Sequence, residues 1–152
     1  MSLLHVSLSA SDPQNVASFL ATVMSGKHMP FPPFPDSWIA FTAADDGTAI
    51  EVYPDTHTLT QGEDQVSCDV GQSDSRPSFC HAAVGSVLSR SEIRLLADDQ
   101  AWPNRICNRG PFHCVEVWVE DRILIEILDQ AMYDDYRRGM TARNWAAMFG
   151  LD

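Results

Sequence analysis

The sequence predicts an α+β protein built from two copies of a βαβββ module. Three observations support this class: alternating apolar strands, helical segments with capping signals, and the same order of elements in both halves of the 152-residue chain. Apolar residues make up 45 % of the chain and charged residues 20 %, as expected for one globular domain. We expect a single domain with module one (1–56), a linker (57–77), module two (78–130) and C-terminal helices (131–152).

The first module opens with an alternating strand over residues 3–9, followed by a helix. Ser11 or Asp12 is predicted to cap this helix, and Gly26 suits its exit. Its apolar face consists of side chains at helical spacing: Val16, Phe19, Leu20 and Val23. Prolines restrict 29–36 to extended chain or loop. The strands "WIAFTA" and "TAIEVY" then form a hairpin around "DDG".

The second module repeats this order after a polar connection. A strand over 79–85 precedes a helix over 89–100, in which Ser89 and Glu92 form a predicted capping box. A weak strand over 105–112 follows. "HCVEVWVE" and "RILIEILD" are predicted to form a hairpin, and the remaining residues form one or two amphipathic helices.

Two glutamates lie inside apolar strands, one in each module. Glu51 occurs in "TAIEVYP" and Glu126 in "ILIEILD". An ionised carboxylate is costly to bury unless a cation pairs with it. A histidine, His5 or His81, lies on the first strand of each module at nearly the same separation from the glutamate. The repeated pattern therefore suggests a common reason for all four side chains.

The faces of the first hairpin can be assigned by side-chain alternation. A two-residue turn in "DDG" pairs Thr42 with Glu51. Glu51 then shares its face with Trp38, Tyr53 and small residues, as in a cleft. Trp38 and Tyr53 are thus candidates for substrate binding.

The second hairpin gives a less clear assignment. A two-residue turn pairs Glu126 with Val117, and it places Glu116 and Trp118 on the opposite face. Both faces are apolar, so alternation alone does not identify the cleft. It does predict that Glu126 is in a dry environment and needs a cationic partner.

Two kinds of partner are open for Glu126. One is an arginine, and the candidates are Arg94, Arg105 and Arg109. The other is a divalent metal, because two neutral imidazoles and two carboxylates balance its charge and leave coordination positions for substrate. The matching positions in both modules favour a shared site whose ligands are His5, Glu51, His81 and Glu126. The metal could be zinc, nickel, cobalt, manganese or iron.

This arrangement resembles the vicinal oxygen chelate superfamily, and most closely its glyoxalase I (lactoylglutathione lyase) branch. The resemblance covers residues 3–130 and rests on "LHVSL", "VASFLATVMSG", "WIAFTAADDGTAIEVYP", "CHAAV" and "DRILIEILD". It implies a metal that binds vicinal substrate oxygens and stabilises an enediolate, with Glu126 or Glu51 as the catalytic base. It also implies a small-molecule substrate and a homodimer.

The resemblance is weaker for the substrate. Glutathione-binding members tend to carry an arginine shortly after the first histidine, where this chain has "VSLSASD". Arg109, beside Gly110-Pro111, is a candidate for binding a substrate carboxylate. Two other functions remain open: an extradiol-type dioxygenase, which uses two histidines and one carboxylate, and a metal-free ligand-sequestering protein of the drug-resistance type.

Charge and hydropathy limit the classes of partner that the protein can bind. The net charge of −11 argues against binding to a nucleic-acid backbone. No apolar run approaches the roughly 20 residues that span a bilayer. The first residues resemble no signal peptide, and the four cysteines form no CxxC pair. We therefore expect a cytoplasmic protein without nucleic-acid or membrane partners.

Overall fold

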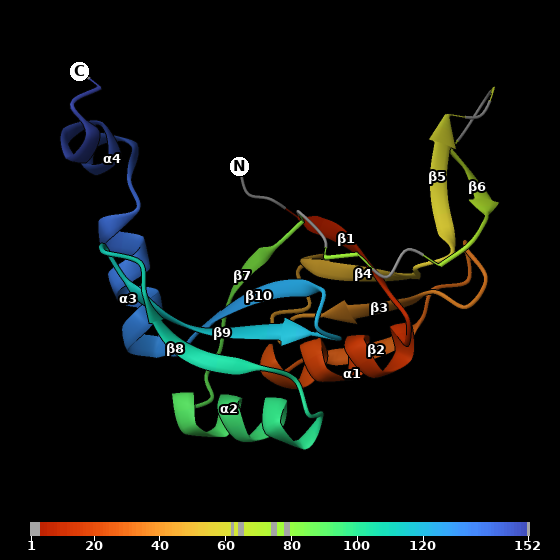
Figure 1. Cartoon of the computed structure of the whole chain (residues 1–152), viewed down its shortest axis with the longest axis horizontal. Coiled ribbons are helices and arrows are strands. Elements are labelled where there is room, and N and C mark those ends of the chain that lie inside the picture. Colours follow the sequence, from red (N-terminus) through yellow and green to blue (C-terminus); the bar gives the residue numbers. More distant parts are fainter. Residues whose placement is uncertain (1–3, 62, 64–65, 74–75, 78–79, 152) are drawn as a thin grey trace. The chain divides into compact units, whose positions relative to one another are not determined.

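The computed structural model describes residues 4–61, 63, 66–73, 76–77 and 80–151 (Figure 1). The chain forms two compact units, Met1–Cys80 (unit one) and His81–Asp152 (unit two). Each unit contains one four-stranded mixed sheet and one predicted βαβββ module. The α+β fold class is therefore confirmed.

Unit one has the strand order β1-β4-β3-β2. β1 and β4 are parallel, whereas β3 pairs antiparallel with both β4 and β2. The elements are β1 (His5–Ala10), α1 (Pro13–Val23), β2 (Lys27–Pro30), β3 (Trp38–Phe41) and β4 (Ala49–Pro54). The proline-rich segment contributes only Met29 and Pro30 to a strand, at the end of the edge strand β2, where a missing N–H is tolerated. Leu3, in the predicted first strand, lies outside the described residues.

Helix α1 begins as the sequence predicts. Asp12 is its N-cap and accepts a hydrogen bond from the Asn15 amide at 3.0 Å, while Pro13 occupies the first turn. The predicted apolar face of α1 is buried. The helix contacts β2, β3 and β4 (Figure 1). Leu8 and Val52 are opposite each other on neighbouring strands and are buried in this core.

Unit two repeats the topology with the strand order β7-β10-β9-β8. The elements are β7 (Ala82–Gly85), α2 (Arg90–Asp99), β8 (Asn104–Asn108), β9 (His113–Val119) and β10 (Ile123–Leu128). The capping box of Ser89 and Glu92 is confirmed. Helix α2 contacts β8 and β9, and Ile93 of α2 is fully buried. Phe79, the first residue of the predicted strand, lies outside the described residues.

Two helices complete the chain, α3 (Gln130–Gly139) and α4 (Ala142–Phe149). Asp129 caps α3 by accepting from the Met132 amide at 2.9 Å, and its other oxygen accepts from Arg90 Nε at 2.8 Å. Tyr136 of α3 packs edge-on against Phe112. No helix among the described residues has the length and apolar character needed to cross a membrane.

The connection between the modules contains an element that the sequence did not predict. β5 (His57–Gln61) and β6 (Val66–Val70) form a separate antiparallel hairpin (Figure 1). Polar side chains dominate this stretch, so the alternation that marks a half-buried strand is weak.

The predicted register of the first hairpin is wrong. Ile39, and not Thr42, is opposite Glu51, because Thr42 pairs with Thr48 across a longer loop. Trp38 is opposite Val52 and therefore lies on the face opposite to Glu51. Its indole packs against His28, with ring centroids 5.6 Å apart.

The second hairpin also differs from its predicted register by one residue. Val119 pairs with Ile123, so three residues form the turn and Glu126 is opposite Glu116. Trp118 consequently shares the face of Glu126, whereas Val117 lies on the buried face with Ile125. The isoleucine face of β10 is therefore the core, and the opposite face carries the two buried carboxylates, Glu116 and Glu126.

Candidate functional site

Glu51 is held in place by two hydroxyl groups of unit one. Ser7 lies directly opposite Glu51 on β1, and its Oγ donates to Glu51 Oε2 at 2.8 Å. The Tyr53 hydroxyl donates to the same oxygen at 2.9 Å. The other oxygen, Oε1, lies 4.0 Å from Nε2 of His5, whose side chain is 59 % exposed. One carboxylate oxygen is thus fixed, and the other faces an imidazole.

The proline-rich segment surrounds Tyr53 with aromatic rings. The ring centroids of Phe31 and Phe34 lie 6.0 and 5.4 Å from that of Tyr53. Burial, followed by the hydrogen bond to Glu51, raises the pKa of Tyr53 to about 12. The tyrosine therefore remains a neutral donor to Glu51 over the whole physiological range.

Replacing Glu51 with glutamine should lower the pKa of Tyr53 from about 12 towards its ordinary value of about 10, because the carboxylate no longer opposes ionisation. Since the folded pKa is raised, Tyr53 contributes stability that is present below about pH 10 and lost as the pH rises through about 12. Ultraviolet titration of phenolate formation measures this shift. A Tyr53→Phe variant identifies the transition, and an unchanged titration in Glu51→Gln would contradict the assignment.

Glu126 is paired with an arginine. Arg109 Nε donates to Glu126 Oε1 at 2.8 Å, and Arg109 Nη2 donates to Oε1 of Glu116. Arg105 binds the other oxygen of Glu116. The two carboxylates are 10 % and 3 % exposed, respectively, and the four charges sum to zero. Of the three arginine candidates, Arg109 is therefore the partner of Glu126; Arg94 instead donates to Asn104.

The network shifts the pKa values of Glu116 and Arg109 in the directions that favour their charged forms. Burial alone would raise the pKa of Glu116, but the hydrogen bond from Arg105 and the charge of Arg109 outweigh it and lower that pKa. The hydrogen bond to Glu126 raises the pKa of Arg109. Arg109 also donates through Nη1 to Cys107 Sγ at 3.3 Å. All three guanidinium nitrogens are therefore engaged, and binding of a substrate carboxylate by Arg109 stays a prediction.

Glu116 is the residue that sequence reasoning missed. It lies between Val115 and Val117, in the same kind of apolar setting that drew attention to Glu126. The erroneous register placed it on the far face of the sheet. Glu116 could have been found by the same signal as Glu126, which is a carboxylate inside an apolar strand.

The two modules present their histidine and glutamate in the same register. In unit one His5 precedes Ser7, the residue opposite Glu51, by two positions. In unit two His81 precedes Ala83, the residue opposite Glu126, by two positions. His5 is the first residue of β1, so alternation places it on the side of Glu51, whereas His81 directly precedes β7 and lies outside the strand on which it was predicted.

These residues fit a divalent metal. Each carboxylate has one oxygen held by donors of its own unit, which is how metal-ligating carboxylates are oriented in proteins. Within either unit, the described residues include no group of three or more His, Cys, Asp or Glu side chains that could hold an ion. Each unit thus offers one histidine and one glutamate. The assignment of all four as ligands stays a prediction.

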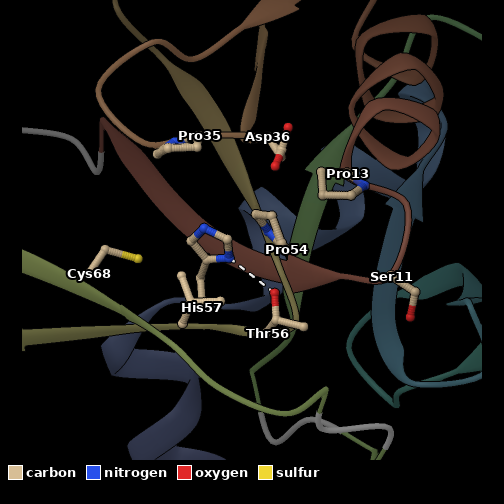
Figure 2. A pocket seen from close by; sticks show the side chains of 9 residues that line it. Ser11, Pro13, Pro35, Asp36, Pro54, Thr56, His57 and Cys68 are labelled. Atoms are coloured by element: carbon tan, nitrogen blue, oxygen red, sulfur yellow. Dashed lines mark hydrogen bonds between the residues drawn. The ribbon is translucent and has the colours of Figure 1, made fainter.

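A cavity of about 430 Å³ lies elsewhere in unit one, between the α1 entry and the β5–β6 hairpin (Figure 2). Its lining combines prolines, polar side chains, a cysteine and a valine: Ser11, Pro13, Pro35, Asp36, Pro54, Thr56, His57, Cys68 and Val70. His57 Nδ1 lies 3.2 Å from the Thr56 hydroxyl. The cavity contains none of the predicted site residues.

Comparison with known proteins identifies the fold. No family model and no curated protein sequence matches the chain. Among solved structures, lactoylglutathione lyase from Agrobacterium tumefaciens is similar with a TM-score of 0.57 and 8 % identity, covering 87 % of this chain and 96 % of that one.

Two further structures have the same architecture. The trypanothione-dependent glyoxalase I of Leishmania major has a TM-score of 0.51 and 14 % identity, covering 100 % of this chain and 99 % of that one. The fosfomycin resistance protein FosX of Listeria monocytogenes, in complex with Mn(II) and sulfate, has a TM-score of 0.52 and 13 % identity, covering 90 % and 96 %. The chain therefore shares the fold of these two glyoxalases and of FosX.

Proposed function

We propose that this protein is a divalent-metal-dependent lyase or isomerase of the glyoxalase type. Its ligands are His5, Glu51, His81 and Glu126, and its substrate is a small molecule with vicinal oxygens. The observation that carries the proposal is the repeated register, in which a histidine lies two positions from the residue opposite each oriented glutamate. The fold likeness to a protein that binds Mn(II) adds support.

A bound divalent ion would supply Lewis-acid polarisation of the substrate oxygens. Zinc, nickel, cobalt, manganese and iron all suit histidine and carboxylate ligands. We further propose that the protein acts as a cytoplasmic homodimer, because the resemblance implies a dimer. Sedimentation velocity at micromolar concentration tests the dimer.

The two glutamates differ in the charge of their hydrogen-bonding partners. Protonation of Glu126 would remove one of the two carboxylate charges that face the guanidinium of Arg109. The partners of Glu51 are neutral hydroxyls of Ser7 and Tyr53, so protonation leaves no charge unpaired. We therefore assign the base to Glu51 and an orienting role to Tyr53, whose hydroxyl fixes the carboxylate.

Metal content tests the site directly. The purified protein, stripped with chelator and reloaded with each of the five metals in turn, should retain about one ion for each complete site. The His5→Ala and Glu126→Gln variants should each lose most of the bound metal. His28→Ala and His113→Ala are matched controls, because both histidines are exposed on strands and neither belongs to the predicted ligand set.

Retention of metal by both ligand variants, with circular dichroism unchanged, would refute the four-ligand site. A wild-type protein that binds none of the five metals but sequesters a planar organic ligand would favour the metal-free binding function. The Arg109–Glu126 ion pair is the observation that favours this second function, because it satisfies Glu126 without a metal.

A further inference from the structure

Two cysteines of unit two lie directly opposite each other on neighbouring strands. Cys107 on β8 pairs with Cys114 on β9. Hydrogen bonds from Arg109 N to Phe112 O and from Trp118 N to Pro103 O, both 2.9 Å, show that this is a hydrogen-bonded position of the ladder. Such a position separates the Cα atoms by about 5.5 Å, and a disulfide spans Cα distances of about 4.4–6.8 Å. Both side chains also lie on the same face of the sheet.

The two thiols differ in accessibility. Cys107 is partly exposed on β8, which is the edge strand of its sheet. Cys114 is completely buried, and burial, together with the charge of Glu126, raises its pKa to about 12. Cys107 is therefore the more accessible of the two residues to a reagent from solution, whereas Cys114 can react only with a group already brought next to it.

We infer that Cys107 and Cys114 form a reversible dithiol–disulfide pair that reacts with small disulfides such as oxidised glutathione. The Cys107 sulfur attacks the small disulfide and forms a mixed disulfide, with release of one thiol. The Cys114 sulfur then attacks Cys107, forms the cross-strand disulfide and releases the second thiol. The protein loses two protons and two electrons, and the small disulfide takes them up and is reduced to two thiols.

Oxidation also alters the contacts of Arg109. The sulfur of Cys107 accepts a hydrogen bond from Arg109 Nη1 at 3.3 Å, and it must turn towards Cys114 to form the new bond. At a hydrogen-bonded position of the ladder the two Cβ atoms are farther apart than at a non-hydrogen-bonded position. The disulfide must draw them together, so it is strained and easily reduced. This makes the pair reversible. The inference does not depend on the proposed metal site.

The experiment uses chelator-treated full-length protein and oxidised glutathione. The wild type should lose the mass of two hydrogens, peptide mapping should link Cys107 to Cys114, and dithiothreitol should reverse the change. Cys114→Ser should instead keep one glutathione on Cys107, and Cys107→Ser should form neither product at these positions. Cys68→Ser and Cys80→Ser are matched controls in unit one, and the 107–114 link should form in both.

Two results would overturn the inference. One is a wild type that carries stable glutathione on Cys107 without closing to Cys114. The other is a link that maps to Cys68 or Cys80 in place of the predicted pair. Unfolding curves of both unit-two variants verify that the fold is retained, so that a missing link reflects the chemistry of the thiols.

Discussion

Replacing Arg109 with methionine should lower the free energy of unfolding by about 3 kcal/mol, because it leaves two buried carboxylates facing each other with one fewer cation. Glu116 and Glu126 are directly opposite on β9 and β10, and Arg109 contacts both. Arg105 remains on Glu116 only. Urea unfolding at pH 7 measures the loss. Arg94→Met is the control, since the contact of Arg94 with Asn104 is exposed and it should change stability little.

The stability lost in Arg109→Met should depend on pH. The pKa of Glu116 is lowered in the folded protein, so its ion pairs contribute stability that is present above its unfolded pKa of about 4.3 and lost as the pH falls through the folded value. The difference in the free energy of unfolding between wild type and Arg109→Met should therefore shrink as the pH is lowered below about 4.3.

A charge-balanced double variant separates charge from packing. Arg109→Met combined with Glu126→Leu removes one charge of each sign and leaves Arg105 with Glu116. This double variant should recover most of the stability lost in Arg109→Met. A double variant as unstable as the single one would show that Arg109 acts through its packing and not through its charge.

The order of elements could be read from the sequence because it depends on local signals. The spacing of Val16, Leu20 and Val23 marks the buried face of α1, and the side chains of Ser89 and Glu92 define the start of α2. Each of these patterns lies within one element, so no knowledge of distant contacts was needed.

The strand registers could not be read in this way. Turn length depends on backbone conformation, and Asp45, Glu120 and Asp121 all adopt positive φ angles that their residue types do not announce. An error of one residue then moves every side chain to the other face. This is why Trp38 was placed beside Glu51 and Glu116 was placed away from Glu126.

The partner of Glu126 could be identified only from the tertiary structure. The sequence offered three arginines, and the choice among them depends on how β8, β9 and β10 align. Arg109 follows β8, continues its alternation through Cys107, and reaches across β9 to β10. A partner two strands away is set by tertiary register and leaves no mark in local periodicity.

Among the glycines that the structure describes, Gly26 should be the most damaging to replace with alanine, with a loss of about 3 kcal/mol in the free energy of unfolding. A Cβ there would lie 1.8 Å from the carbonyl oxygen of Phe41 and 2.8 Å from its carbonyl carbon. Both are backbone atoms at the end of β3, so no side-chain rotation relieves the overlap.

The strain would reach the candidate site, because β3 is the direct neighbour of β4 and Ile39 is opposite Glu51. Gly26 is held by its own amide, which donates to the Ala21 carbonyl at 2.8 Å, so β3 must move away from the end of α1. Gly71→Ala is the matched control in the same unit, since its Cβ would meet no atom within 4 Å. Equal unfolding midpoints for the two variants would show that the α1–β3 approach is looser than these distances require.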